Sequence, residues 1–201
     1  MFRLAIVFLL AMSGMVSAEA LTKVFENERR LVERLPEARL ASLLERPELE
    51  VEYSGAWLAG LSPRTGGADW RCLAEALYFE ARGESVKGQF AVAEVILNRV
   101  DSPEFPDEVC AVVNQGTGAK YQCQFTYTCD GHKEVVSEPE AFELVGKVAH
   151  LMVQGAPRPL TKGATHYHTR AVNPRWAGVF PRTATIGVHH FYRMPTRLSA
   201  N

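Results

Sequence analysis

Between residues 70 and 82, apolar side chains recur at the spacing of an α-helix. This pattern predicts a helix from Trp70 to Arg82, with Asp69 as its N-cap and Gly83 after its end. Residues three or four apart share one face of a helix. One carboxylate falls on the same face as three apolar residues, in the set Leu73, Ala76, Leu77 and Glu80. Glu80 is therefore expected on the apolar side, near the C-terminal end of the helix.

Two later segments also have helical patterns. The sequence QFAVAEVILNRV is apolar around most of the helix circumference, which is typical of a helix in the centre of a domain. We expect this helix to begin at Val86 or Gly88 and to end at Val100. A third helix is predicted over Pro139–Gln154, and the short segment 109–114 fits either a helix or a strand.

Two short runs near the C-terminus alternate between apolar and polar residues. They are ATHYHT at 164–169 and ATIGVHHFYR at 184–193, and each predicts one strand of a small antiparallel sheet. Together with the helices, they indicate a mainly helical core with a β appendage. The predicted fold class is therefore α+β.

The N-terminal part of the chain has a different composition. Residues 1–18 combine a basic start with a short apolar run and small residues before Glu19, which is the pattern of a cleaved signal peptide. Residues 19–69 form a charged leader that is partly helical or disordered, with a candidate amphipathic helix over Asn27–Leu44 that a proline interrupts. The folded domain is placed at 70–201, and no second apolar segment of membrane length follows the signal.

Charge and cysteine content narrow the possible partners. Lys plus Arg is 22 and Asp plus Glu is 23, so no strong field favours nucleic acid or anionic lipid. The four cysteines of the exported part allow two disulfides in any of three pairings. Cys123 and Cys129 would close a short loop, which leaves Cys72 for Cys110. A zinc site is the competing interpretation, but the gaps between the cysteines are long and no C-x-x-C motif is present.

Glu80 is the first candidate for chemistry. A carboxylic acid among apolar side chains has a raised pKa, because the charged form is disfavoured there, and it can then act as a general acid near neutral pH. The partial negative charge at the helix C-terminus favours the same protonated form. The alternative is a buried structural acid that pairs with Arg82 or Arg99, and the spacing alone leaves both open.

Other polar residues near this motif have less specific patterns. Glu84 follows the glycine, so we expect a solvent-exposed charge at the helix end, with a second catalytic carboxylate as the alternative. Glu94 and Asn98 are four residues apart on the central helix. They line the same cleft as Glu80 or mark the one polar face of their helix.

Two groups of residues could bind a sugar. Aromatic rings stack on the apolar face of a sugar and amides bond its hydroxyls, although a surface loop that packs its rings on the core is the alternative. The loop before residue 131 supplies Gln124, Phe125, Tyr127 and Asp130. The first strand supplies a polar groove wall from His166, Tyr167 and His168. Two histidines on one face could bind a metal, but no third ligand is near in the sequence, so we expect no metal.

Several separate segments together resemble the SleB/CwlJ-type cell wall hydrolases. They occur in the order ALYFEARGES, GQFAVAEVILNRV, FPDEVCAVVNQG, CQFTYTCDG, GATHYHT and TATIGVHHFYR, and they cover about residues 70–193. The resemblance implies a lysozyme-like α+β fold. It also implies lytic transglycosylase chemistry with one essential glutamate in the E-A-R-G-E segment, which is Glu80 or Glu84 here. Thr126 replaces the serine of the family pattern and keeps its hydroxyl.

The resemblance implies an exported enzyme that cleaves the glycan strand of peptidoglycan between N-acetylmuramic acid and N-acetylglucosamine. We expect a periplasmic or secreted monomer that uses no cofactor and has no membrane span once the signal is removed. Two alternatives remain. One is an N-acetylmuramoyl-L-alanine amidase, which would ordinarily require zinc, and the other is a non-catalytic peptidoglycan-binding module in which Glu80 is a structural acid.

Overall fold

The structure is a computed structural model that describes residues 22–23, 25–26, 49–116, 120 and 122–195. The chain divides into two compact units, Met1–Glu48 and Leu49–Asn201. The predicted signal peptide and the predicted helix over residues 27–44 lie outside the described residues. Within the described part of the chain, no helix has the length and apolar character that a membrane crossing requires.

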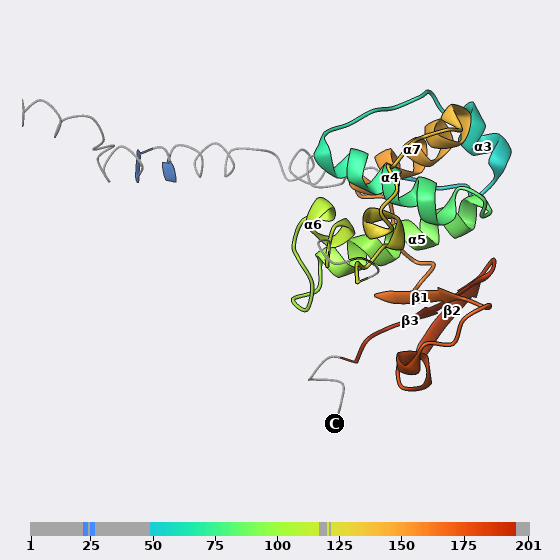
Figure 1. The fold of residues 1–201 in the computed structure, drawn as a ribbon. Coiled ribbons are helices and arrows are strands. Elements are labelled where there is room, and N and C mark those ends of the chain that lie inside the picture. The colour runs from blue at the N-terminus through green and yellow to red at the C-terminus, as the bar shows by residue number, and fades with distance from the viewer. Residues whose placement is uncertain (1–21, 24, 27–48, 117–119, 121, 196–201) are drawn as a thin grey trace, which may run out of the picture. The chain divides into compact units, whose positions relative to one another are not determined.

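The larger unit contains five α-helices in its described residues (Figure 1). They are α3 (Gly55–Gly60), α4 (Ala68–Ala81), α5 (Val86–Val100), α6 (Val109–Val113) and α7 (Pro139–Val153). The three helices predicted from periodicity are confirmed as α4, α5 and α7, and the ambiguous segment 109–114 forms a helix. The N-cap prediction is wrong, because Gly67 occupies that position and Asp69 lies in the first turn of α4. An acidic residue in that turn still interacts favourably with the helix N-terminus.

Helix α5 occupies the centre of the helical core, as its apolar circumference predicts. Its residues Phe90, Val92 and Ile96 are buried together with side chains of α4, α6 and α7. Helix α4 packs against α7, where Trp70 Nε1 donates to the carbonyl oxygen of Gly146 at 2.9 Å. A Cβ at residue 146 would lie 3.3 Å from the Trp70 ring, so the glycine permits this close approach.

Residues 49–69 belong to the larger unit, whereas the sequence pattern placed them in the leader. The Leu58 side chain of α3 is 1% exposed. Lys147 Nζ donates to the carbonyl oxygen of Ala59 at 3.1 Å, and the Tyr53 ring packs edge-on against Phe90 at 5.3 Å. Tyr53, Leu58 and Ala59 therefore contact the helical core of the larger unit.

The sheet has three antiparallel strands in the order β1-β3-β2: β1 (His166–Thr169), β2 (Arg182–Ile186) and β3 (His189–Tyr192). The run at 184–193, predicted as one strand, instead covers parts of β2 and β3, with a turn at Gly187, whose φ is +57°. One face of the sheet packs on α5, where Phe191 joins Ala91 and Val95 in a second buried cluster. The fold class is α+β, as predicted.

Both disulfides form in the predicted pairing. Cys72–Cys110 joins α4 to α6, and Cys123–Cys129 closes the loop that contains the short 3₁₀-helix η1 (Thr126–Cys129). The first bridge spans 38 residues and the second spans 6. The helical core and the loop that follows α6 are therefore both covalently closed.

Candidate active site

Glu80 lies in the last turn of α4 and is partly exposed. The Tyr167 hydroxyl donates a hydrogen bond to Glu80 Oε2 at 3.2 Å. Alternation along β1 directs Tyr167 toward the helical core and its histidine neighbours toward the opposite face. The end of α4 and the middle of β1 thus meet at one carboxyl group, although 87 residues separate them in the sequence.

The surroundings of Glu80 favour its protonated form. Burial raises the pKa of Glu80 above its ordinary value, while the Tyr167 hydrogen bond and the positive charge of Arg99 act in the opposite direction. Burial is the largest of the three effects, so the net shift is upward. A carboxyl group in this state can hold a proton at a pH where an exposed glutamate has lost it.

The arginines that could have locked Glu80 into an ion pair bind elsewhere. Arg82 Nε lies 2.6 Å from Glu138 Oε2. Arg99 Nε donates to the carbonyl oxygen of Thr165 at 2.6 Å. Within the described ranges, neither arginine forms an ion pair with Glu80. No such ion pair therefore holds the carboxyl group in its charged form.

Glu84 was predicted to be an exposed charge, and this is wrong. Its side chain is 14% exposed, and Glu84 Oε1 lies 3.7 Å from Nδ1 of the buried His189. A Cβ at Gly187 would collide with Glu84 Oε2, so the turn between β2 and β3 lies directly against the carboxylate. The hairpin covers Glu84, and single-sequence patterns do not show which hairpin will cover a helix end.

Glu94 and Asn98 do not mark a polar face of α5, which corrects that alternative. Glu94 is 1% exposed, and its carboxylate accepts hydrogen bonds from the backbone of Leu160 and from the backbone and hydroxyl of Thr161. Asn98 Nδ2 donates to the carbonyl oxygen of Ala164 at 2.9 Å. Both side chains hold the segment before β1 against α5.

The loop residues predicted to bind sugar occupy different environments. Phe125 is 2% exposed and belongs to the core. The Tyr127 ring stacks on Phe79 with centroids 4.5 Å apart, and burial together with nearby carboxylates, Glu80 among them, raises the pKa of its hydroxyl. Gln124 is exposed on the surface, whereas Asp130 Oδ1 accepts from the backbone of His132. Of these four, Tyr127 has an electrostatic link to Glu80, and their sugar-binding role stays a prediction.

The residues predicted as a groove wall divide between two faces of the sheet. His166 and His168 lie opposite Tyr192 and His190 of β3, on the face away from Tyr167. Trp176 contacts both histidines, with centroids 5.1 and 5.6 Å away. Burial lowers the pKa of His166 to about 4. Among the described residues, no group of three or more His, Cys, Asp or Glu side chains is arranged to hold a metal ion.

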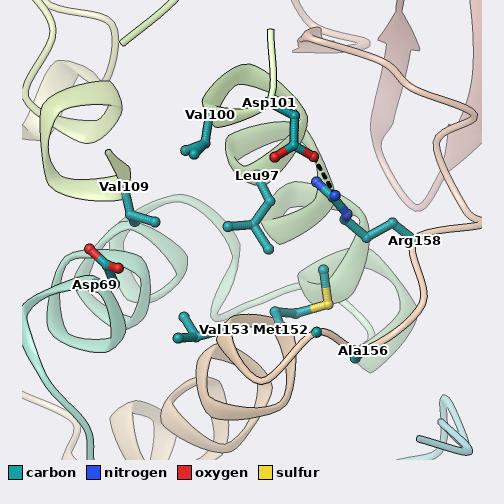
Figure 2. Close-up of a pocket in the computed structure, with 10 residues that line it drawn as sticks. Asp69, Leu97, Val100, Asp101, Val109, Met152, Val153, Ala156 and Arg158 are labelled. Atoms are coloured by element: carbon teal, nitrogen blue, oxygen red, sulfur yellow. Dashed lines mark hydrogen bonds and ion pairs between the residues drawn. The ribbon is translucent and has the colours of Figure 1, made fainter. Parts of the chain in front are cut away.

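A pocket of about 290 Å³ lies away from the predicted site residues (Figure 2). It is bounded by the C-terminal parts of α5 and α7, and at its rim Asp101 forms an ion pair with Arg158. Apolar side chains line most of it: Leu97, Val100, Val109, Met152, Val153 and Ala156. The lining contains neither Glu80 nor Tyr167.

Curated proteins similar to this chain are spore cortex-lytic enzymes. The enzyme of Bacillus subtilis (strain 168) is 32% identical over 123 residues, which cover 61% of this chain and 37% of that protein. The enzyme of Halalkalibacterium halodurans is 36% identical over 124 residues, or 61% of this chain and 34% of the relative. The matched region thus spans about a third of the length of these relatives.

Two solved structures resemble the larger unit. One is the catalytic domain of the germination-specific lytic transglycosylase SleB from Bacillus anthracis, at 30% identity and a TM-score of 0.51, covering 66% of this chain and all of that one. The other is the catalytic domain of Bacillus cereus SleB, at 31% identity and the same TM-score. These matches confirm the predicted lysozyme-like α+β fold.

The family model described as Cell Wall Hydrolase matches residues 83–192. This range is more than half of the 201 residues and includes α5, α6, α7 and the sheet. Glu84 lies inside it, and Glu80 lies three residues before it. The chain belongs to the cell wall hydrolase family.

Proposed function

We propose that this protein cleaves the glycan strand of peptidoglycan between N-acetylmuramic acid and N-acetylglucosamine, as a lytic transglycosylase with Glu80 as its acid and base. The observation that carries the proposal is the half-buried Glu80 carboxyl, which Tyr167 holds and which forms no ion pair with an arginine in the described part of the chain. Family membership and the similarity to SleB catalytic domains support the choice of substrate.

Protonated Glu80 donates its proton to the glycosidic oxygen as the bond to muramic acid breaks. The sugar passes through an oxocarbenium-like state, in which positive charge develops next to the ring oxygen. The carboxylate left on Glu80 is then available to stabilise that charge. Tyr167 holds the carboxyl group through its hydroxyl, so the orientation of the donor does not depend on the substrate.

In the second step, the Glu80 carboxylate accepts the proton of the 6-hydroxyl of the same muramic acid. The oxygen of that hydroxyl bonds to the anomeric carbon, so the strand ends in a 1,6-anhydro ring and Glu80 regains its proton. One group therefore acts first as acid and then as base. Hydrolysis would instead require a second carboxylate, as nucleophile or as base for water, and Glu84 is the nearest along the chain.

The other parts of the proposal concern location and assembly. The predicted signal peptide directs export to the periplasm or outside the cell, where the protein acts as a monomer. Disulfides persist in oxidising compartments, so the two bridges that use all four cysteines support this location.

The test uses the exported chain and purified, insoluble peptidoglycan. We expect soluble muropeptides with 1,6-anhydro ends, identified by mass spectrometry because they are one water lighter than the hydrolysed products. New reducing ends without anhydro products would show that the enzyme hydrolyses the glycan strand and is not a transglycosylase. Free stem peptides would indicate an amidase, and binding without release would indicate a non-catalytic module.

A further inference from the structure

Arg99 is a buried cation that binds the chain just before β1, the strand whose Tyr167 donates to the proposed catalytic acid. Its residue is 1% exposed, although arginine is rarely buried without a paired charge. The guanidinium faces two aromatic rings, with its carbon 5.4 Å from the Phe105 centroid and 5.7 Å from that of Phe125. Such a cation has a role that packing alone does not explain, since an apolar residue would fill the same space at lower cost.

Three segments of the chain meet at this guanidinium. Arg99 itself belongs to α5, and its Nε donates to the carbonyl oxygen of Thr165, just before β1. With the Gln124 amide oxygen turned toward the guanidinium, Nη1 and Nη2 each donate to it at 3.2 Å. Both acceptors are neutral. Within the described residues, no carboxylate forms an ion pair with Arg99, so its positive charge is not cancelled.

We propose that Arg99 is a positioning residue of the Glu80 site, which fixes the strand that supplies Tyr167 to Glu80 and keeps a buried positive charge in the interior. Arg99 does not touch the substrate in this proposal. The hydrogen bond from Arg99 to Thr165, two residues before Tyr167, fixes the start of β1. The consequence for catalysis rests on the proposed function, whereas the effect on the Glu80 proton does not.

The groups around Glu80 act in opposite directions. Burial raises the pKa of Glu80, and the positive charge of Arg99 and the Tyr167 hydrogen bond lower it. The charge of Glu80 raises the pKa of the Tyr127 hydroxyl in η1. Glu75 of α4 and Glu134 shift the pKa of Tyr127 in the same direction. Burial lowers the pKa of Arg99 to about 10, so the guanidinium remains charged at neutral pH.

The charge on Arg99 matters after proton donation. Once Glu80 has given up its proton, a carboxylate stands in a poorly hydrated site, and a nearby cation stabilises that carboxylate. Without the cation, Glu80 would hold its proton more tightly. The alkaline limb of the cleavage rate would then move to higher pH, because Glu80 must be protonated to act as the acid.

The experiment replaces Arg99 in the full chain and follows the ¹³C carboxyl resonance of Glu80 by NMR as a function of pH, with assignment by Glu80→Gln. For Arg99→Gln we expect a Glu80 pKa raised by about one unit or more. Arg99→Lys keeps the charge and should restore most of the wild-type value. Arg158→Gln is the matched control, because Arg158 donates to Asp101 and Asn98 and should leave the titration unchanged.

A second variant keeps the proposal testable if Arg99→Gln does not fold. In Gln124→Glu, a carboxylate replaces the amide that accepts from the Arg99 guanidinium and would pair with its charge. Thr126→Glu is the control, because it adds the same charge at another exposed position of the loop. We expect Gln124→Glu, and not Thr126→Glu, to raise the pKa of Glu80. An unchanged Glu80 titration in a folded Arg99→Gln or Gln124→Glu variant would overturn the inference. A shifted titration without peptidoglycan cleavage would count against the proposed function alone.

Discussion

At the scale of single residues, Glu80 is kept in an environment that costs stability. A carboxyl group with a raised pKa binds more protons in the folded protein than in the unfolded chain. Between its ordinary pKa of 4.5 and the raised value, the free energy of unfolding therefore falls as pH increases. Active sites often contain such groups, because the geometry that chemistry requires differs from the one that stability favours.

Replacing Glu80 by Gln should therefore stabilise the protein at neutral pH. The Gln amide oxygen can still accept from Tyr167, and no charge remains to be desolvated. We expect the Tm of Glu80→Gln to exceed that of the wild type at pH 7, and the difference to shrink toward pH 4. Thermal unfolding followed by circular dichroism measures this, and a lower Tm at pH 7 would show that Glu80 contributes to stability instead.

The sequence pattern predicted the place of Glu80 on an apolar helix face, but not how Tyr167 and Arg99, which it also named as candidates, act on it. A carboxylate on an apolar helical stripe is visible from spacing alone. Tyr167 and Arg99 act on Glu80 from β1 and α5, and the sequence contains no local signal for contacts across such separations. Glu84 was placed at the surface for the same reason, since its cover comes from the distant β2–β3 turn.

At the scale of elements, the helices followed from periodicity more readily than the strands. The bounds of α5 and α7 agree with the pattern because their apolar residues repeat over several turns. The run at 184–193 keeps its alternation through the turn at Gly187, so β2 and β3 could not be separated by pattern. The polar residues of α5 were misinterpreted because their partners lie at 160–164.

Glu94 joins two elements and should be sensitive to substitution. Its carboxylate accepts three hydrogen bonds from Leu160 and Thr161, all donated toward it. In Glu94→Gln, an amide NH₂ replaces one acceptor and faces donors, which leaves buried groups unsatisfied at a cost of about 1–3 kcal/mol. Urea unfolding measures the loss. Glu104→Gln, at an exposed position, is the control and should change stability by less than about 0.5 kcal/mol.

At the scale of the whole molecule, two disulfides reinforce a domain of modest size. The chain-entropy model predicts a stabilisation of roughly 4 kcal/mol for a bridge that closes a loop of the Cys72–Cys110 length, and roughly 2 kcal/mol for the Cys123–Cys129 loop. The first bridge also joins α4, which carries Glu80, to α6. It should therefore contribute more both to stability and to the integrity of the site.

Two double substitutions compare the bridges. We expect Cys72→Ala/Cys110→Ala to lower the urea midpoint more than Cys123→Ala/Cys129→Ala does, because the longer loop loses more entropy when it is closed. Reduction of the wild type with dithiothreitol should reproduce the sum of both losses. The reverse order of midpoints would indicate that the short loop is an essential part of the fold.

The most direct test of the account is the rate of muropeptide release by Glu80→Gln from purified peptidoglycan, with circular dichroism to establish that the variant is folded. A general acid contributes on the order of 100-fold or more, so we predict a loss of at least that size. Glu104→Gln serves as the exposed control and should cleave at the wild-type rate. The assignment of Glu80 as the proton donor would be contradicted if folded Glu80→Gln cleaved at the wild-type rate. It would also be contradicted if Glu84→Gln lost at least about 100-fold in rate while Glu80→Gln did not.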